Sequence, residues 1–276
     1  MEFFDINLVL ASFGGGLFGA SLGVIGAFSF CGVVILTGIA AVASGGSDVI
    51  LKLIAFGPYF GPHISFASAV AATAYAGKKE LLDGSKDILV PLYKTKRFDV
   101  LLVGGIFGVL NYIVNTLLMQ TNIPIDKVAF TIVITNIIAR LVFGRAGLFG
   151  KLPKENSIWP DSSTFGFNVL LGFAVGLISS FATQITGSEV IGFGISAFTL
   201  IFLFYDEFPV THHVSICAAY AAAATGSILV GGIFGILAIL CGEMFGNLFN
   251  SNADTYIDPP ALTIALLSAI VFIFLK

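Results

Sequence analysis

All three histidines of the chain follow segments that break a helix. His63 comes directly after Gly57-Pro58-Tyr59-Phe60-Gly61-Pro62, whose two glycines and two prolines cannot continue a helix, and His212 and His213 come shortly after Pro209. Imidazole gains and loses a proton near neutral pH. Inside a membrane, a broken helix is tolerated only where protein or a water-filled cavity satisfies its backbone. These histidines are therefore candidates for a solute or proton site.

The residues around the two helix starts predict the chemistry of that site. Ser65 and Ser215 each lie two positions after a histidine. The free N–H groups and the positive dipole end of a first helical turn suit an anion or a carboxylate. The alternative is that Pro62 is an ordinary first-turn proline and the histidines only pack. The candidate substrate-binding residues, which we expect to face one shared cavity, are His63, Ser65, His212, His213 and Ser215.

Acidic and amide side chains elsewhere are candidates for gating or ion coupling. Asp126 and Asp258 occupy equivalent places, each before a late apolar segment, and Asp258 precedes two prolines as an N-cap would. Capping explains both aspartates, and gating or coupling is the alternative. Glu243 and Asn115 lie within apolar segments and are further candidates for this role.

Other kinds of chemistry find little support in the residue patterns. Three histidines could bind a transition metal, but no carboxylate or cysteine stands at ligand spacing, so metal binding is left open. No phosphate-binding P-loop or HExxH motif occurs, and no nucleophile–base pair stands out. We therefore expect no enzyme activity and no cofactor.

The composition indicates that these residues belong to a membrane protein. Hydrophobic residues make up 57% of the 276 positions and charged residues 11%, and the mean hydropathy is +1.00. So few charged groups cannot cover a soluble fold, and a net charge of −3 gives no basis for nucleic-acid binding. A spanning helix needs about 20 apolar residues. The sequence predicts about ten helices, at 7–26, 27–44, 50–77, 99–118, 127–144, 165–186, 188–205, 211–226, 228–248 and 260–275.

The basic residues predict the orientation in the membrane. Loops rich in lysine and arginine remain in the cytoplasm. We therefore expect the basic insertion 78–98 and the linker 145–164 to face the cytoplasm, and both termini to lie outside the cell membrane. Ten of the 13 basic residues are assigned to these two loops: Lys78, Lys79, Lys86, Lys94, Lys96 and Arg97, then Arg140, Arg145, Lys151 and Lys154.

An internal repeat divides the chain. LVGGIFGVL at 102–110 and LVGGIFGIL at 229–237 differ at one position, and Asp126 and Asp258 lie at matching places after them. Each half holds about five helices, and an odd number inverts the second copy across the membrane. The predicted fold is thus an all-α membrane protein of two inverted five-helix repeats, with the broken helices near the pseudo-two-fold axis. The repeats are 1–144 and 165–276, joined by the linker 145–164.

The segments GPHISFASAVAATAYAGKK, the paired LVGGIFG and DTYIDPPA together resemble a prokaryotic family of polytopic inverted-repeat membrane proteins. The resemblance covers most of the chain. The family's activity is uncharacterised, so the resemblance implies a fold but no substrate.

Taken together, the patterns predict a transporter or channel in the cell membrane, with the lipid bilayer as its surroundings. The favoured solute is a small anion or organic acid, carried passively or with proton or ion coupling. The alternatives are a channel for a small neutral solute and a non-transporting membrane scaffold or partner subunit. The oligomeric state is left open, and a homo-oligomer is one of the options.

Overall fold

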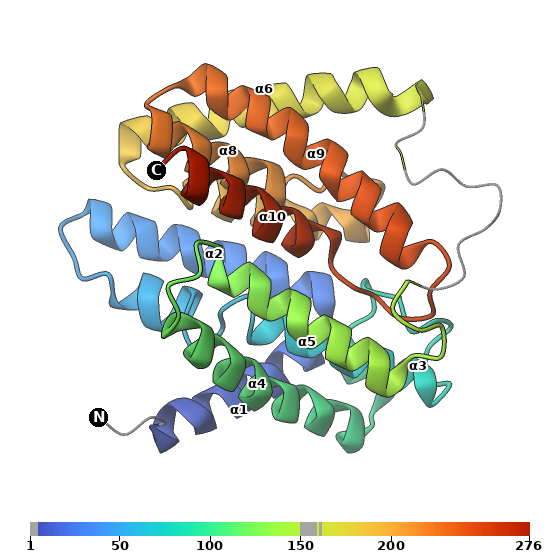
Figure 1. Ribbon diagram of the computed structural model, residues 1–276. Coiled ribbons are helices and arrows are strands. Elements are labelled where there is room, and N and C mark those ends of the chain that lie inside the picture. Colours follow the sequence, from blue (N-terminus) through green and yellow to red (C-terminus); the bar gives the residue numbers. More distant parts are fainter. Residues whose placement is uncertain (1–4, 150–158, 160–161) are drawn as a thin grey trace.

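The computed structural model describes residues 5–149, 159 and 162–276, and within these ranges it contains helices and connecting turns but no strand. Ten α-helices and three short helical turns follow one another along the chain (Figure 1). The predicted segments match the helices to within a few residues, except that segment 50–77 is divided into a π-helical turn and an α-helix that begins at Ser65. The α-helices are α1 Ile6–Leu22, α2 Val24–Ala43, α3 Ser65–Lys78, α4 Phe98–Met119, α5 Lys127–Phe143, α6 Ser162–Thr186, α7 Ile191–Thr199, α8 His212–Thr225, α9 Ile228–Asn250 and α10 Pro259–Phe274.

Side-chain caps and glycines set several helix ends. Asp126 accepts a hydrogen bond from the Ala129 N–H at 2.8 Å, and Asp258 does the same from the Ala261 N–H at 2.8 Å, so both aspartates are N-caps. Gly23 separates α1 from α2 with φ +80°, a left-handed conformation that favours glycine.

The helix break predicted at 57–62 is present. A π-helical turn, Ile50–Ala55, ends just before it, and the chain runs through turns until α3 begins at Ser65. The matching segment of the second half is also irregular, because α7 passes into the 3-10 turn Leu200–Phe204 and α8 begins at His212. Both α3 and α8 therefore start inside the molecule and have 14 residues each.

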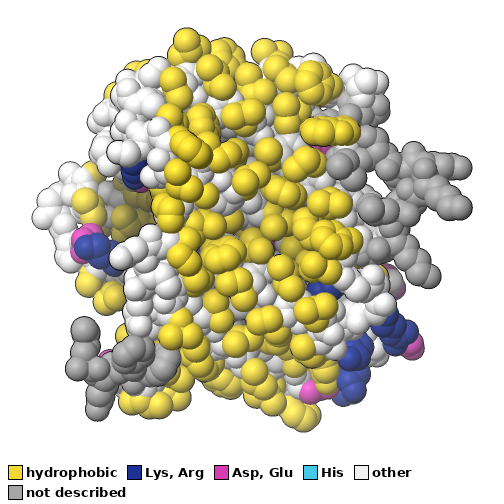
Figure 2. Space-filling view, in the orientation of Figure 1, with side chains coloured by type: hydrophobic (Ala, Val, Ile, Leu, Met, Phe, Trp, Pro, Cys, Tyr) yellow, Lys and Arg dark blue, Asp and Glu magenta, His cyan; other side chains and the backbone are white. Residues whose placement is uncertain are grey.

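Four helices are long and apolar enough to cross a membrane: α2, α4, α6 and α9. Three shorter apolar stretches accompany them, namely α1, Ile191–Phe204 and α10. Figure 2 shows a band of hydrophobic side chains across the middle of the visible face, with charged side chains gathered at its left and right margins. The helices of Figure 1 run across this band, which is the arrangement expected of a membrane protein.

The two halves are packed by matching contacts. In the first half α1 packs on α3 and α4, and in the second half α6 packs on α8 and α9. Glycines bring the backbones together in both: Gly108 lies against Ser12 and Gly16, and Gly235 lies against Gly172 and Gly176. Small residues permit this close approach of helices in lipid.

The halves meet along two pairs of helices, α2 with α7 and α5 with α10. The N–H of Asp126 donates to Ser268 Oγ at 2.8 Å, and the N–H of Asp258 donates to Asn136 Oδ1 at 3.2 Å. The start of each helix thus meets the middle of the other, which requires α5 and α10 to run in opposite directions. Figure 1 shows the same opposition for α1 and α6 and for α4 and α9.

Arg140 lies inside α5 and is 1% exposed, so its assignment to the second basic loop was wrong. Helix α5 continues to Phe143, which carries Arg140 into the packed interior. Lys151 and Lys154 lie outside the described residues, as does most of the predicted linker 145–164. The insertion 78–98 is a loop with one 3-10 turn, Leu92–Thr95, and lies at the end of the molecule opposite the first residues of α1 and the end of α10 (Figure 1).

Candidate functional site

A cavity of about 340 Å³ lies between the two halves. We call it the central cavity. The first half contributes residues of α2, α3, α4 and α5, and the second half contributes residues of α7, α8 and α10. Most of its wall is apolar. The polar side chains on the wall are Lys52, Asp126, His212, Tyr220 and Asp258.

Residues that match between the sequence repeats lie opposite one another around this cavity. Five such pairs contribute to the wall. Two join the end of the helix break and the start of α3 to α8, and three join the start of α5 to that of α10. The central cavity therefore lies at the interface between the repeats, where their matching residues come together. The pairs, first half before second, are Pro62 and His212, Phe66 and Ile216, Asp126 and Asp258, Ala129 and Ala261, and Ile132 and Ile264.

The two aspartates are held by similar bonds. Besides capping α5, Asp126 accepts a hydrogen bond from the Tyr220 hydroxyl at 2.6 Å. Besides capping α10, Asp258 accepts one from the Tyr256 hydroxyl at 3.1 Å. A carboxylate has about four acceptor positions. Each aspartate therefore keeps acceptor capacity for a bound solute or water.

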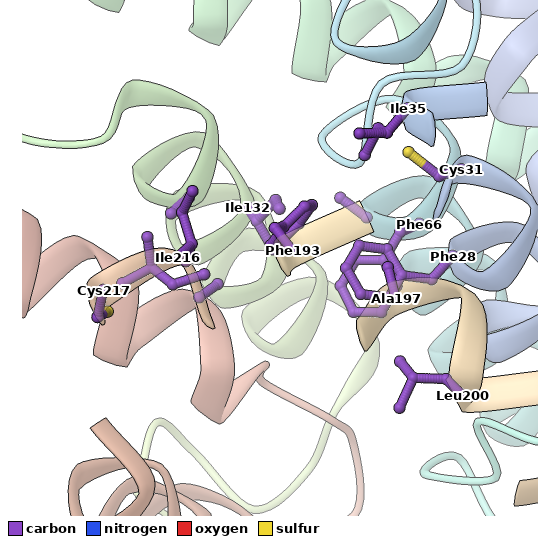
Figure 3. Packing of buried hydrophobic residues seen from close by; sticks show 14 of the residues in the cluster. Phe28, Cys31, Ile35, Phe66, Ile132, Phe193, Ala197, Leu200, Ile216 and Cys217 are labelled. Carbon is purple, nitrogen blue, oxygen red and sulfur yellow. The ribbon is translucent and has the colours of Figure 1, made fainter. Parts of the chain in front are cut away.

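His212 is enclosed by aromatic rings. Its ring centroid lies 4.7 Å from that of Phe28 and 5.8 Å from that of Phe193, both in edge-on geometry. Figure 3 shows Phe28, Phe66 and Phe193 gathered in the core between the halves. His212 Nδ1 has no hydrogen-bond partner among the described residues. This nitrogen is buried against its neighbours, so the aromatic rings fix the position of the imidazole on the wall.

The charge of the central cavity comes mainly from its carboxylates. Lys52 contributes to the wall, but its ammonium group forms an ion pair with Asp48 at 2.5 Å. Asp126 and Asp258 have no cationic partner within ion-pair distance in the described part of the chain. The cavity is therefore an apolar space with two carboxylates, one imidazole and one phenol.

A second cavity of about 530 Å³ lies within the second half, between α6, α8, α9 and the start of α10. We call it the lateral cavity. Its polar wall residues include Asn168, His213, Glu243 and Tyr256. Glu243 accepts a short hydrogen bond from the Asn168 amide at 2.5 Å. His213 is buried, and neither of its ring nitrogens has a hydrogen-bond partner within the described ranges.

The structure thus separates the predicted site residues. The central cavity is walled by His212, Asp126 and Asp258, and the lateral cavity by His213 and Glu243. Each of the remaining four lies outside both walls, in the packed interior or between helices. Those four are His63, Ser65, Ser215 and Asn115.

These four residues have local surroundings of their own. His63 is buried with Nδ1 unpaired among the described residues. The Ser65 hydroxyl donates to the Phe60 carbonyl at 3.1 Å, and Ser215 Oγ lies 2.8 Å from Ser196 Oγ. Asn115 accepts a hydrogen bond from Thr131 at 3.2 Å. The polar groups of Ser65, Ser215 and Asn115 thus join neighbouring backbone and side chains and do not face either cavity.

No group of three or more histidine, cysteine or acidic side chains that could hold a metal ion occurs in residues 5–149, 159 and 162–276. The three cysteines in these ranges are free, with Cys31 and Cys217 buried and Cys241 half-buried.

Several polar residues of the two cavities were not predicted from the sequence. Tyr220 and Tyr256 orient the two aspartates, and Asn168 holds Glu243. Tyr256 stands two residues before Asp258, a spacing that the sequence displays directly. Tyr220 and Asn168 are joined to their partners only by the tertiary fold, across 94 and 75 positions of the chain.

Comparison with known proteins adds a family but no activity. No curated protein and no solved structure matches the chain. The sequence model of a family of unknown function, DUF7973, matches residues 1–166 and 154–275, two segments that overlap between α5 and α6. Together they cover nearly the whole sequence, and the resemblance to a family of uncharacterised activity is confirmed: the chain belongs to the DUF7973 family, a family of unknown function.

Proposed function

We propose that this protein moves a small solute across a membrane and binds it in the central cavity. The observation that carries this proposal is the composition of the cavity wall, to which matching residues of both halves contribute in pairs. Transporters built from repeats bind their solutes at the interface between the repeats. A scaffold or partner subunit has no use for such a cavity.

The arrangement proposed for the chain is ten crossings in two inverted repeats. The reciprocal bonds between α5 and α10 support this, because Asp126 meets Ser268 while its counterpart Asp258 meets Asn136. Reciprocal contacts of this kind belong to two-fold symmetry. Since the paired helices are antiparallel, the proposed axis is perpendicular to them and lies in the membrane plane. In this arrangement α3 and α8, which follow the broken segments, begin within the membrane.

The solute class follows from the wall of the cavity. A volume of 340 Å³ suits a small molecule, and the apolar wall suits one with an apolar body. The sequence favoured an anion because of the helix starts and histidines. The two carboxylates favour a cationic or hydrogen-bond-donating solute instead, because Lys52 is already paired with Asp48. A channel for a neutral solute is the second candidate, and the largely apolar wall favours it.

The proposed location is the cell membrane, with both termini outside and residues 78–98 in the cytoplasm. The charge distribution supports this orientation, because the basic insertion lies at the opposite end of the molecule from α1's first residues. Asp126 and Asp258 are the residues that we propose for ion or proton coupling, since each is a carboxylate on the cavity wall.

Transport by this route is tested by filling the cavity. Ala261 is 1% exposed and lies on the wall, so Ala261→Phe places a ring in the space that the solute would occupy. Ala174→Phe, on the exposed face of α6, adds the same ring on the outside of the molecule and serves as the control. Proteoliposomes are assayed with a panel of solutes, by electrical current for charged solutes and by osmotic swelling for neutral ones.

We expect at least one solute to give a signal that Ala261→Phe abolishes and Ala174→Phe leaves intact. A signal with cationic solutes supports coupling through the carboxylates, and a signal with neutral solutes supports the channel. No signal across the panel, or a signal that Ala261→Phe does not change, overturns the proposal and favours the scaffold.

A further inference from the structure

The lateral cavity carries one charged group and one unpaired histidine. Glu243 is the sole acidic or basic side chain on its wall among the described residues, and it accepts a hydrogen bond from Asn168. The rest of the wall is mainly apolar and includes Phe167, Leu171 and Pro260. Its charge is therefore negative, and its shape offers room for an apolar body.

His213 lies on the inner wall of this space, where the start of α8 packs on α9. The side chain is 4% exposed, and both ring nitrogens lack a hydrogen-bond partner among the described residues. Nε2 is directed toward Gly242, another wall residue, where an added Cβ would lie only 2.6 Å from this nitrogen. Both nitrogens are buried, so the ring shapes the wall without presenting a nitrogen to the space.

The lateral cavity adjoins the central cavity. His212 lies on the wall of the central cavity and His213 on that of the lateral cavity, with ring centroids 5.6 Å apart. Tyr256 faces the lateral cavity, and its hydroxyl donates to Asp258, which faces the central one. Two pairs of polar side chains therefore form the partition between the spaces.

We propose that the lateral cavity is a second binding site, specific for a small organic cation that has one ammonium group and an apolar body. The ammonium donates to the Glu243 carboxylate, and the apolar body lies against Phe167 and Leu171. In so far as the site is a second station for the transported solute, it rests on the proposed function. Binding itself is measurable without transport.

Competing ligand classes fit the wall less well. An anion would meet Glu243 without a cationic side chain from the described residues to balance it. A transition metal would find only His213 and Glu243 as its usual ligands on this wall. A neutral ligand would gain nothing from the charge of Glu243.

The test compares three probes of similar shape: benzylammonium, benzyl alcohol and benzoate. Binding of each to the purified protein in lipid nanodiscs is measured by calorimetry. We expect benzylammonium to bind at least about tenfold more tightly than the other two, as a charge-assisted hydrogen bond would provide. This comparison requires no variant. Equal affinity for benzylammonium and benzoate overturns the proposal.

Variants then locate the bound probe. Glu243→Gln removes the charge, keeps the size and can still accept from Asn168, so it should weaken benzylammonium binding about tenfold. Glu207→Gln, an exposed carboxylate on neither wall, is the matched control and should change nothing. Asp126→Asn reports on the central cavity, so any part of the binding that falls only in this variant is assigned to that cavity.

If Asp126→Asn abolishes binding and Glu243→Gln leaves it unchanged, the probe binds in the central cavity and the lateral site is overturned. The two proposals fail independently. Flux that Ala261→Phe abolishes, without benzylammonium binding, keeps the proposed function and removes the lateral site. Binding that depends on Glu243, without flux of any solute, keeps the lateral site and removes the proposed function.

Discussion

At the scale of single residues, helix geometry explains why the predicted histidine site divides in two. Successive residues of an α-helix point about 100° apart, since 3.6 residues make one turn. His212 and His213 open α8 side by side, yet one faces the central cavity and the other the lateral cavity. The repeat matches His63 to His213 and Pro62 to His212. It is therefore Pro62, and not His63, that reaches the central cavity.

The aspartates show what the sequence could provide at this scale. Their role as N-caps was available from the chain alone, because Asp258 precedes two prolines and Asp126 matches it. The tyrosine hydroxyls that donate to these aspartates could be predicted from the sequence only in part. Tyr256 is a near neighbour of Asp258, whereas Tyr220 reaches Asp126 from a distant helix. Contacts of the second kind depend on packing between the halves, and no local pattern encodes them.

Arg140 is expected to be essential for stability. Its guanidinium donates to the Leu148 carbonyl at 2.8 Å, the Phe249 carbonyl at 2.6 Å and Asn250 Oδ1 at 3.0 Å, and to both the hydroxyl and the carbonyl of Thr255. Lysine has three donors on one atom and cannot reach these separate acceptors. Arg140→Lys should therefore lower the free energy of unfolding by about 3 kcal/mol, with several acceptors left unpaired.

The measurement for Arg140→Lys is the midpoint of thermal unfolding in detergent. Arg145→Lys is the control, since Arg145 is exposed and close in sequence. Equal midpoints for the two variants would mean that the buried guanidinium contributes little.

At the scale of elements, apolar segment length and the proline–glycine break identified the helices and the irregular segment before α3. The sequence was less informative about which helices pack against each other. Gly104 and Gly108 are four residues apart, as are Gly231 and Gly235, and this spacing favours close helix contacts in lipid without indicating the partner helix. The structure gives α1 as the partner of α4 and α6 as the partner of α9. The choice depends on which chain segments are brought together, and this is a property of the whole fold.

These glycine contacts predict matching effects in the two halves. A Cβ on Gly108 would overlap the Ser12 carbonyl and lie 3.1 Å from the Gly16 Cα, and one on Gly235 would lie 2.9 Å from the Gly176 Cα. Gly108→Ala and Gly235→Ala should each destabilise the protein by about 1–3 kcal/mol through overpacking. Thermal unfolding midpoints measure both.

Gly14→Ala is the control for the glycine variants. Gly14 lies in α1 with nothing within 4 Å of an added Cβ, so alanine there should raise stability slightly, by up to about 1 kcal/mol. A destabilised Gly14→Ala variant would show that helix glycines matter here for a reason other than close packing.

At the scale of the whole molecule, the charge distribution predicts the orientation. In a background with the three native cysteines replaced by alanine, Ser47→Cys and Lys94→Cys report on the loops at opposite ends of the helices. We expect a membrane-impermeant maleimide to label Ser47→Cys in intact cells. Lys94→Cys, in the basic insertion, should react only after the cells are permeabilised. The reverse pattern would invert the topology.

Arg140 also has a consequence for the synthesis of the chain. Its partners Phe249, Asn250 and Thr255 follow it by 109 to 115 residues. At translation rates of about 5–20 residues per second, roughly 5–20 s pass before the ribosome has made them. During that interval α5 is already synthesised but its guanidinium has only the Leu148 carbonyl within its own half. We therefore expect the cationic end of α5 to remain near the lipid headgroups until the loop between α9 and α10 is made, and the first half to reach its final insertion depth only when the last helices leave the ribosome.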